Sequence, residues 1–104
     1  MSKSTMLTDR LGNKYWKNSK GKLHRTGGPA AELSNGDKEW CVNGKLHRLN
    51  GPAIERSDGE KAWYVNDKFL GYDNKGFWKL WDTLTPEQKQ DPVLLSYLPV
   101  DFNV

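Results

Sequence analysis

Two His-Arg pairs are the side chains of this sequence best suited to recognising an anion. His24-Arg25 and His47-Arg48 lie 23 residues apart in the same local context. If the two segments stack as neighbouring strands, equivalent positions lie about 5 Å apart, so two imidazoles and two guanidiniums could together grip a phosphate or a carboxylate. Tyr64 is expected to be exposed and could stack a nucleotide base beside them. These five residues form the predicted ligand site.

The same His-Arg pairs also have a structural interpretation. Glu32 and Glu55 each follow the corresponding histidine by eight residues. Contacts from Arg or His to Glu between strands would explain the repetition, because a residue copied into every unit is suited to building the unit. The sequence leaves both interpretations open. A metal site is not expected, since two histidines without a cysteine pair or a carboxylate cluster are a poor ligand set.

Catalytic signatures are absent from the sequence. Cys41 follows a tryptophan and has no glycine-rich nucleophile motif around it, so we expect a structural free thiol. Glu32 and Glu55 occupy equivalent repeat positions, whereas an acid and base pair needs environments that push the two pKa values apart. We therefore expect a protein that is not an enzyme and uses no cofactor. A small nucleotide-cleaving enzyme is the least supported alternative.

The His-Arg pairs belong to an internal repeat that sets the architecture. Residues 44–53 are a near copy of residues 21–30 at an offset of 23, and Trp16, Trp40 and Trp63 fall in one column. A period between about 20 and 50 residues indicates one supersecondary unit stacked on copies of itself. Three such units are visible in the sequence.

Two of the units depart from the common pattern. The first has one extra residue after its tryptophan, which a bulge or a longer turn at residues 17–20 would absorb. The third has Leu70-Gly71 in place of the His-Arg pair and lacks the Gly-Pro-Ala that ends the other two. It resembles a terminal, capping copy of the kind that repeat arrays require.

Turn dipeptides divide each unit into two short antiparallel strands. An Asn-Gly or Asp-Gly between two short runs predicts a type I′ hairpin turn, because that turn needs positive φ at both central residues. These dipeptides are Asn35-Gly36 and Asp58-Gly59, and a second tight turn is marked by Asn43-Gly44 and Asn66-Asp67. Trp40 shares strand parity with Val42, and Trp63 with Val65, so we expect the tryptophans in a common core. The residues expected on the opposite face are Cys41 and Tyr64.

After residue 74 the pattern changes to a helical period. Phe77, Leu80, Trp81 and Leu84 fall at i, i+3, i+4 and i+7, which predicts an amphipathic helix. Further helix starts are marked by Thr85-Pro86 and Asp91-Pro92. This tail is predicted to cover the open end of the sheet, since a free last strand invites pairing with other chains.

Together these patterns predict a mostly β fold with an α C-terminus. It is a meander of about three β-hairpin repeats, with a period of about 23 residues, capped by a short helical tail. We expect a single domain over residues 1–104, with an N-terminal segment at 1–11, hairpin repeats at 12–73 and the helical cap at 74–104.

The composition of the chain indicates where the protein is located and which classes of partner it can bind. The chain has a single cysteine and no run of about 18 apolar residues, so we expect a soluble cytoplasmic protein without membrane association. A net charge of +3 is compatible with a phosphate-bearing partner. No RNA-recognition or helix-turn-helix motif is present, so binding to duplex nucleic acid is not expected. Pairing of edge strands could join two copies into a homo-oligomer.

The unit Trp-x-x-Asn-Gly-Lys-Leu-His-Arg-x-x-Gly-Pro-Ala, which starts at Trp40, resembles the MORN-type hairpin repeats. It is most similar to the variant found in small proteins of tailed phages and giant viruses, and the resemblance covers roughly residues 12–71. It implies a twisted meander of hairpins, no catalytic motif, and a surface that binds proteins, lipids or small ligands. A phage-encoded protein of this type is expected to act in the host cytoplasm by sequestering or blocking a defence component, such as a nucleotide-derived signal.

An alternative function is direct inhibition of a host enzyme through a protein–protein contact. In that case the helical tail would supply the anchor, because large aromatic side chains dominate protein interfaces. The predicted anchor residues are Phe77, Trp78 and Trp81.

Overall fold

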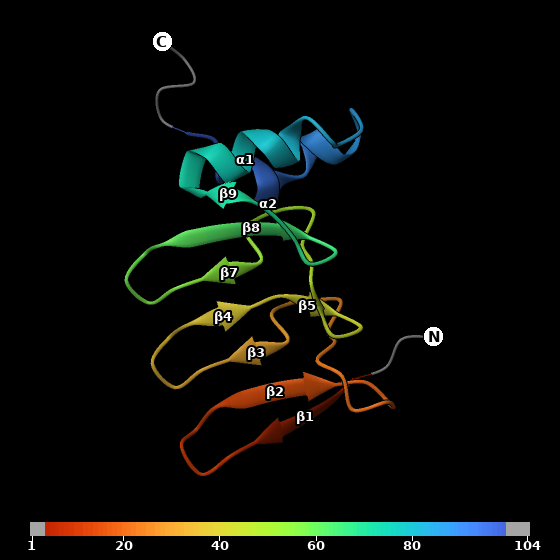
Figure 1. Ribbon diagram of the computed structural model, residues 1–104, viewed down its shortest axis with the longest axis vertical. Helices are drawn as coiled ribbons and strands as arrows, with labels where there is room; N and C mark the ends of the chain where they lie inside the picture. Colours follow the sequence, from red (N-terminus) through yellow and green to blue (C-terminus); the bar gives the residue numbers. More distant parts are fainter. Residues whose placement is uncertain (1–3, 100–104) are drawn as a thin grey trace.

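The computed structural model describes residues 4–99, in which seven strands form one antiparallel sheet (Figure 1). In spatial order they are β1 (Thr5–Thr8), β2 (Lys14–Lys17), β3 (Ala31–Glu32), β4 (Lys38–Glu39), β7 (Ile54–Glu55), β8 (Lys61–Val65) and β9 (Lys68–Tyr72). A separate two-stranded hairpin consists of β5 (Cys41–Val42) and β6 (Lys45–Leu46). The hairpins stack along the longest of three dimensions, 47 × 32 × 22 Å. The predicted meander of hairpins with a C-terminal helical cap is confirmed.

The first hairpin begins at Thr5, earlier than the predicted start of the repeats at residue 12. Strand β1 pairs with β2 in the same antiparallel manner as the later strands, with Leu7 opposite Tyr15. Its four residues contain neither a tryptophan nor a turn dipeptide, and the only repeat residue beside it is Gly12, which aligns with Gly36 and Gly59. Residues 1–3 and 100–104 of the predicted domain lie outside the described residues.

Two kinds of turn connect the strands, and only one is the predicted type. Asn43 and Gly44 both have positive φ, at 51° and 81°, as type I′ requires. Asn66 and Asp67 share this conformation, at 49° and 68°. At Asn35-Gly36 and Asp58-Gly59 only the glycine has positive φ: Gly36 has φ of 102°, and its amide donates to Leu33 O at 2.9 Å. The type I′ prediction for Asn35-Gly36 and Asp58-Gly59 is therefore wrong. These are three-residue loops that close with a left-handed glycine.

The extra residue of the first unit lengthens its second turn, as predicted. Asn18 N donates to Lys22 O at 2.9 Å, and Gly21 N donates back to Asn18 O at the same distance. Asn18 also donates through its side-chain amide to the Asn43 side chain of the next unit at 3.1 Å. The longer turn therefore still docks on the shorter one above it.

The three tryptophans occupy equivalent positions, but they do not share a core, so that prediction is corrected. Trp63 is 2% exposed and packs in an apolar cluster between β8 and the helices. Trp16 and Trp40 are only half-buried, because arginine side chains rather than apolar ones cover them. The other members of the cluster are Phe77, Leu80, Leu84 and Leu94.

The helical tail covers one end of the sheet (Figure 1). Helix α1 (Asp73–Trp81) follows β9 directly and packs against β8 and β9. A 3₁₀ turn, η1 (Gln88–Gln90), and the short helix α2 (Pro92–Leu95) complete the tail. Asp91 accepts a hydrogen bond from Val93 N at 2.8 Å, which confirms the predicted cap at Asp91-Pro92. No helix within residues 4–99 is long and apolar enough to cross a membrane.

Candidate functional site

Each of the first two units holds an arginine between a tryptophan ring and a glycine. The Arg48 guanidinium carbon lies 3.8 Å from the centroid of the Trp40 ring. On the other side is Gly51, so near that a Cβ there would lie 2.6 Å from the same carbon. The stack combines a cation–π contact with close packing, and the Arg48 side chain is only 10% exposed. We call this arrangement an Arg–Trp clamp. The first clamp consists of Arg25, Trp16 and Gly28.

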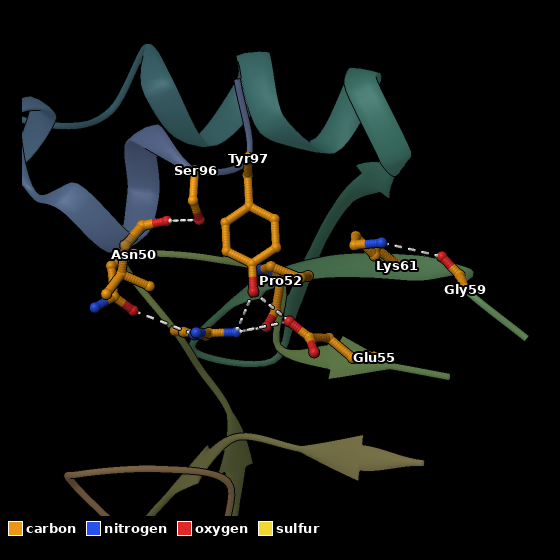
Figure 2. A network of polar contacts seen from close by, with 9 residues as sticks. Asn50, Pro52, Glu55, Gly59, Lys61, Ser96 and Tyr97 are labelled. Carbon is orange, nitrogen blue, oxygen red and sulfur yellow. Dashed lines mark hydrogen bonds and ion pairs between the residues drawn. The ribbon is translucent and has the colours of Figure 1, made fainter. Parts of the chain in front are cut away.

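Polar partners from the same unit and from the tail fix Arg48. Its Nη1 donates to Pro52 O at 3.1 Å and to Glu55 Oε2 at 3.2 Å, and its Nε donates to Asn50 Oδ1 at 3.1 Å. Tyr97 donates its hydroxyl to the same Glu55 carboxylate, as Figure 2 shows. Burial, and next this hydrogen bond, raise the pKa of Tyr97, so the hydroxyl remains a donor at neutral pH.

Arg25 is held less firmly than Arg48. Its Nη1 donates to Pro29 O at 3.2 Å and to Glu32 at 3.4 Å. The two charged side chains are 30% and 34% exposed, so the ion pair is screened by solvent. The predicted Arg–Glu contact is thus present in both units, and the first of them keeps an accessible guanidinium.

Both imidazoles bond to the turn of the following unit rather than to glutamate. His24 Nδ1 accepts from Asn43 N at 3.0 Å, and His47 Nδ1 accepts from Asn66 N at 3.1 Å. These amides belong to the type I′ turns, so each histidine ties one repeat to the next. His24 is 2% exposed, and no partner is found for its Nε2 within residues 4–99. The predicted His–Glu contact is replaced by this link between units.

A cleft of about 750 Å³ lies where the first two units meet the tail. It brings together three predicted ligand residues, Arg25, His47 and Arg48, beside the Trp40 ring. His24 and Tyr64 do not line it. The loop of the first unit, the second unit and the tail contribute the remaining walls, namely Thr26, Gly27, Gly28, Pro29, Val42, Leu49, Asn50, Gln88, Asp91 and Val93.

Tyr64 belongs to a different surface. Its ring lies 5.2 Å from that of Phe69, which lies 4.9 Å from that of Tyr72. Phe69 and Tyr72 are 46% and 53% exposed. Strands β8 and β9 therefore carry an aromatic patch (Tyr64, Phe69 and Tyr72) apart from the cleft, in which Tyr64 is half-buried rather than exposed as expected.

The predicted partner anchor on α1 is used inside the protein. Phe77 is 1% exposed and stacks edge-on against Trp63 at 5.6 Å. Trp78 and Trp81 are partly buried and pack against the same core cluster. Lys89 lies over the Trp81 ring at 5.2 Å from its centroid. Because the helix needs this stripe to cover the sheet, Phe77 cannot reach a partner in this fold.

Sequence reasoning missed the contribution of the tail to the cleft. Asp91 accepts a hydrogen bond from the Asn50 side-chain amide at 3.3 Å, which joins the tail to the loop of the second unit. One signal was available: Asn50 stands where the first unit has Gly27, between an arginine and a Gly-Pro-Ala that both units share. Such a departure from the repeat marks a position with a partner outside the repeats.

Cys41 shows none of the properties of a reactive thiol. It is free, buried, and its pKa is raised to about 11, first by burial and then by the charges of Glu39 and Asp67. Within residues 4–99 no three His, Cys, Asp or Glu side chains are grouped to hold a metal ion.

No family model, curated protein or solved structure matches this chain. Interpretation of the cleft therefore rests on its own chemistry. A tryptophan ring, an accessible guanidinium and a glycine-containing loop can together hold an aromatic group that carries an acidic substituent.

Proposed function

We propose that this protein is a non-catalytic binding protein whose cleft captures a small nucleotide-like anion. The observation that carries the proposal is the meeting of Arg25, His47 and the Trp40 ring in one space of about 750 Å³. Pockets for small molecules and cofactors have volumes of roughly 300–1,000 Å³, with a few polar groups among apolar walls. Trp40, Val42 and the other apolar side chains supply such walls here.

The two arginines have different roles in this proposal. Arg48 is committed to Glu55, Pro52 and the Trp40 ring, so it positions the wall on which a base would stack. Arg25 is the residue that meets the phosphate, because both of its described hydrogen bonds use Nη1 and its partner Glu32 is partly exposed. Since exposed ion pairs are weak, a phosphate can compete with Glu32 for this guanidinium.

The biological setting of the proposal comes from the resemblance of the repeat to those of small phage proteins. A phage-encoded binder in the host cytoplasm would lower the free concentration of a nucleotide-derived signal and so block the defence that depends on it. Sequestration requires affinity and abundance but no turnover, which suits a chain without a catalytic motif.

Isothermal titration calorimetry against cyclic nucleotides and ADP-ribose-type nucleotides tests the proposal. Gly27→Leu is the decisive variant: Gly27 lines the cleft, has no positive φ, and has no atom within 4 Å of where its Cβ would be. The added side chain adds bulk to the cleft wall without backbone strain, so we expect affinity to fall by at least about tenfold. Ser19→Leu, on an exposed turn outside the cleft, is the matched control and should bind as the wild type does.

Two outcomes of this titration would replace the proposal. Failure of every nucleotide to bind, or equal binding by Gly27→Leu, removes the cleft as the site. Cleaved nucleotide in the recovered samples, detected by chromatography, would instead show an enzyme.

The second candidate, direct inhibition of a host enzyme, is favoured by the aromatic patch rather than by the helix. Exposed clusters of large rings are common in protein interfaces. A complex with the target should be lost in Phe69→Ser/Tyr72→Ser and kept in Gly27→Leu. The reverse pattern would assign the interaction to the cleft.

A further inference from the structure

One end of the sheet is covered by a helix, and the other end is an exposed edge strand. At one end α1 packs on β9, whereas at the other end β1 lies uncovered by any described residue (Figure 1). All four residues of β1 are exposed, and the side chains of Met6 and Leu7 keep 47% and 50% of their accessible surface. A bare edge strand offers a row of unpaired backbone groups to another strand.

The hydrogen-bond pattern identifies which groups of β1 are free. Asp9 N donates to Asn13 O at 3.0 Å at the end of the hairpin. Bonded and non-bonded pairs alternate along an antiparallel ladder, so Leu7 and Thr5 bond to β2, while Met6 and Thr8 direct their N–H and C=O groups outward.

Contacts of the neighbouring strand support this assignment. Trp16, which is opposite Met6, donates its amide to Ala30 O at 2.8 Å and accepts from His24 N at 2.9 Å. Both groups of Trp16 therefore face away from β1, and Met6 has no partner for its own groups on that side.

The composition of β1 gives no protection against pairing. The other six strands of the sheet each carry at least one Lys or Glu, whereas β1 reads Thr-Met-Leu-Thr. Natural edge strands are commonly defended by charges or proline, and β1 has neither. A strand without charge can lie against an identical strand without repulsion.

We propose that β1 pairs antiparallel with β1 of a second copy, about a two-fold axis through Leu7. In this register Met6 of each chain exchanges two hydrogen bonds with Thr8 of the other, which satisfies all four outward-facing groups of each β1. Leu7 meets its own copy as a non-bonded pair, where Cβ atoms approach to about 4.5–5.5 Å. The result is one continuous sheet with a helical cap at each end.

The side chains of the sheet agree with this partner. Leu7 continues a row that passes through Tyr15 and Ala31 and, beyond Glu39, reaches Ile54. Pairing of Leu7 with its copy extends this largely apolar row across the axis. A second copy is therefore favoured over an unrelated strand, since the register that uses every free group also places like apolar residues together.

Charge complementation at Leu7 tests the proposal. By sedimentation equilibrium the wild type should shift from 11.9 kDa towards twice that mass as concentration rises to about 1 mM. Leu7→Lys and Leu7→Glu should each remain monomeric, because the axis places like charges together. Mixed in equal amounts they should regain the dimer mass, since among antiparallel registers only this one places position 7 opposite position 7.

Two further variants separate backbone pairing from simple loss of apolar surface. Met6→Pro removes an outward N–H and spares the bonds between β1 and β2, so it should also be monomeric, with unchanged circular dichroism. Leu11→Lys removes a 75% exposed side chain outside the strand and should dimerise as the wild type does. A monomeric wild type, species larger than a dimer, or no recovery on mixing the two charged variants would overturn the proposal.

Discussion

At the residue scale, a single structural contact explains why the arginine and the glycine of the Arg–Trp clamp recur together. The guanidinium of Arg48 fills the space between the Trp40 ring and the Gly51 backbone. The planar guanidinium can stack on the tryptophan ring. On its other side it leaves room only for a residue without a side chain. This accounts for the joint recurrence of Trp, Arg and Gly-Pro-Ala in the first two units.

Substituting the clamp glycine should therefore destabilise the protein. In Gly51→Ala the new Cβ would lie 2.6 Å from the Arg48 guanidinium carbon, and Arg48 cannot move without leaving Glu55 and Pro52. Overpacking of this kind costs about 1–3 kcal/mol, which urea denaturation can measure. Gly27→Ala is the control, because its Cβ meets nothing within 4 Å and it should unfold as the wild type does. Equal stability of the two variants would mean that the clamp is not tight.

The sequence predicted only those residues of the candidate site that occupy repeated positions. Spacing placed Arg25 and Arg48 in equivalent positions, with His47 next to Arg48, and the structure brings these three to one cleft. It could not show that His24 would be buried against a turn amide, because that depends on the twist between units. The wall formed by Asp91 was also missed, since its contact spans 41 residues and its one sequence signal is Asn50 in the place of Gly27.

At the element scale, the third unit lacks a clamp because α1 takes its place. Leu70-Gly71 stands where the other units have His-Arg, and the face of Trp63 is covered by Gly76 of α1. The sequence predicted this terminal copy and its helical cap. It could not predict the contact between Gly76 and Trp63, which depends on how α1 packs on the sheet. The predicted repeats also began after β1, because this short neutral strand itself has no tryptophan or turn dipeptide and only Gly12 marks the turn that follows it.

Gly76 should be one of the least tolerant positions of the helix. Alanine normally stabilises a helix interior by about 1 kcal/mol relative to glycine. Here its Cβ would lie 2.1 Å from Trp63 Cδ1 and 2.4 Å from Gly71 O, so Gly76→Ala should lower the free energy of unfolding by at least about 2 kcal/mol. Lys79→Ala, at an exposed site of the same helix, should change it by less than about 0.5 kcal/mol in the same denaturation experiment. A stabilised Gly76→Ala would show that α1 is not packed on Trp63.

At the scale of the whole molecule, stability is distributed unevenly along the stack. The apolar cluster around Trp63 lies at the helical end, while β1 is exposed throughout. In repeat architectures each unit contacts only its neighbours, so the units can open separately. Opening should therefore begin at the hairpin of β1 and β2 and reach β8 and α1 last.

Amide hydrogen exchange, measured residue by residue, tests both the order in which the hairpins open and the pairing of β1 with a second copy. In dilute protein, the Leu7 amide should exchange more slowly than those of Met6 and Thr8, because it alone of the three bonds to β2. Amides of β8 should be the slowest of the sheet. At high concentration, Met6 and Thr8 should become protected in the wild type and stay unprotected in Leu7→Lys, because pairing with a second copy engages them. Equal protection in all hairpins would contradict stepwise opening, and fast exchange at Met6 at every concentration would leave β1 an unpaired edge.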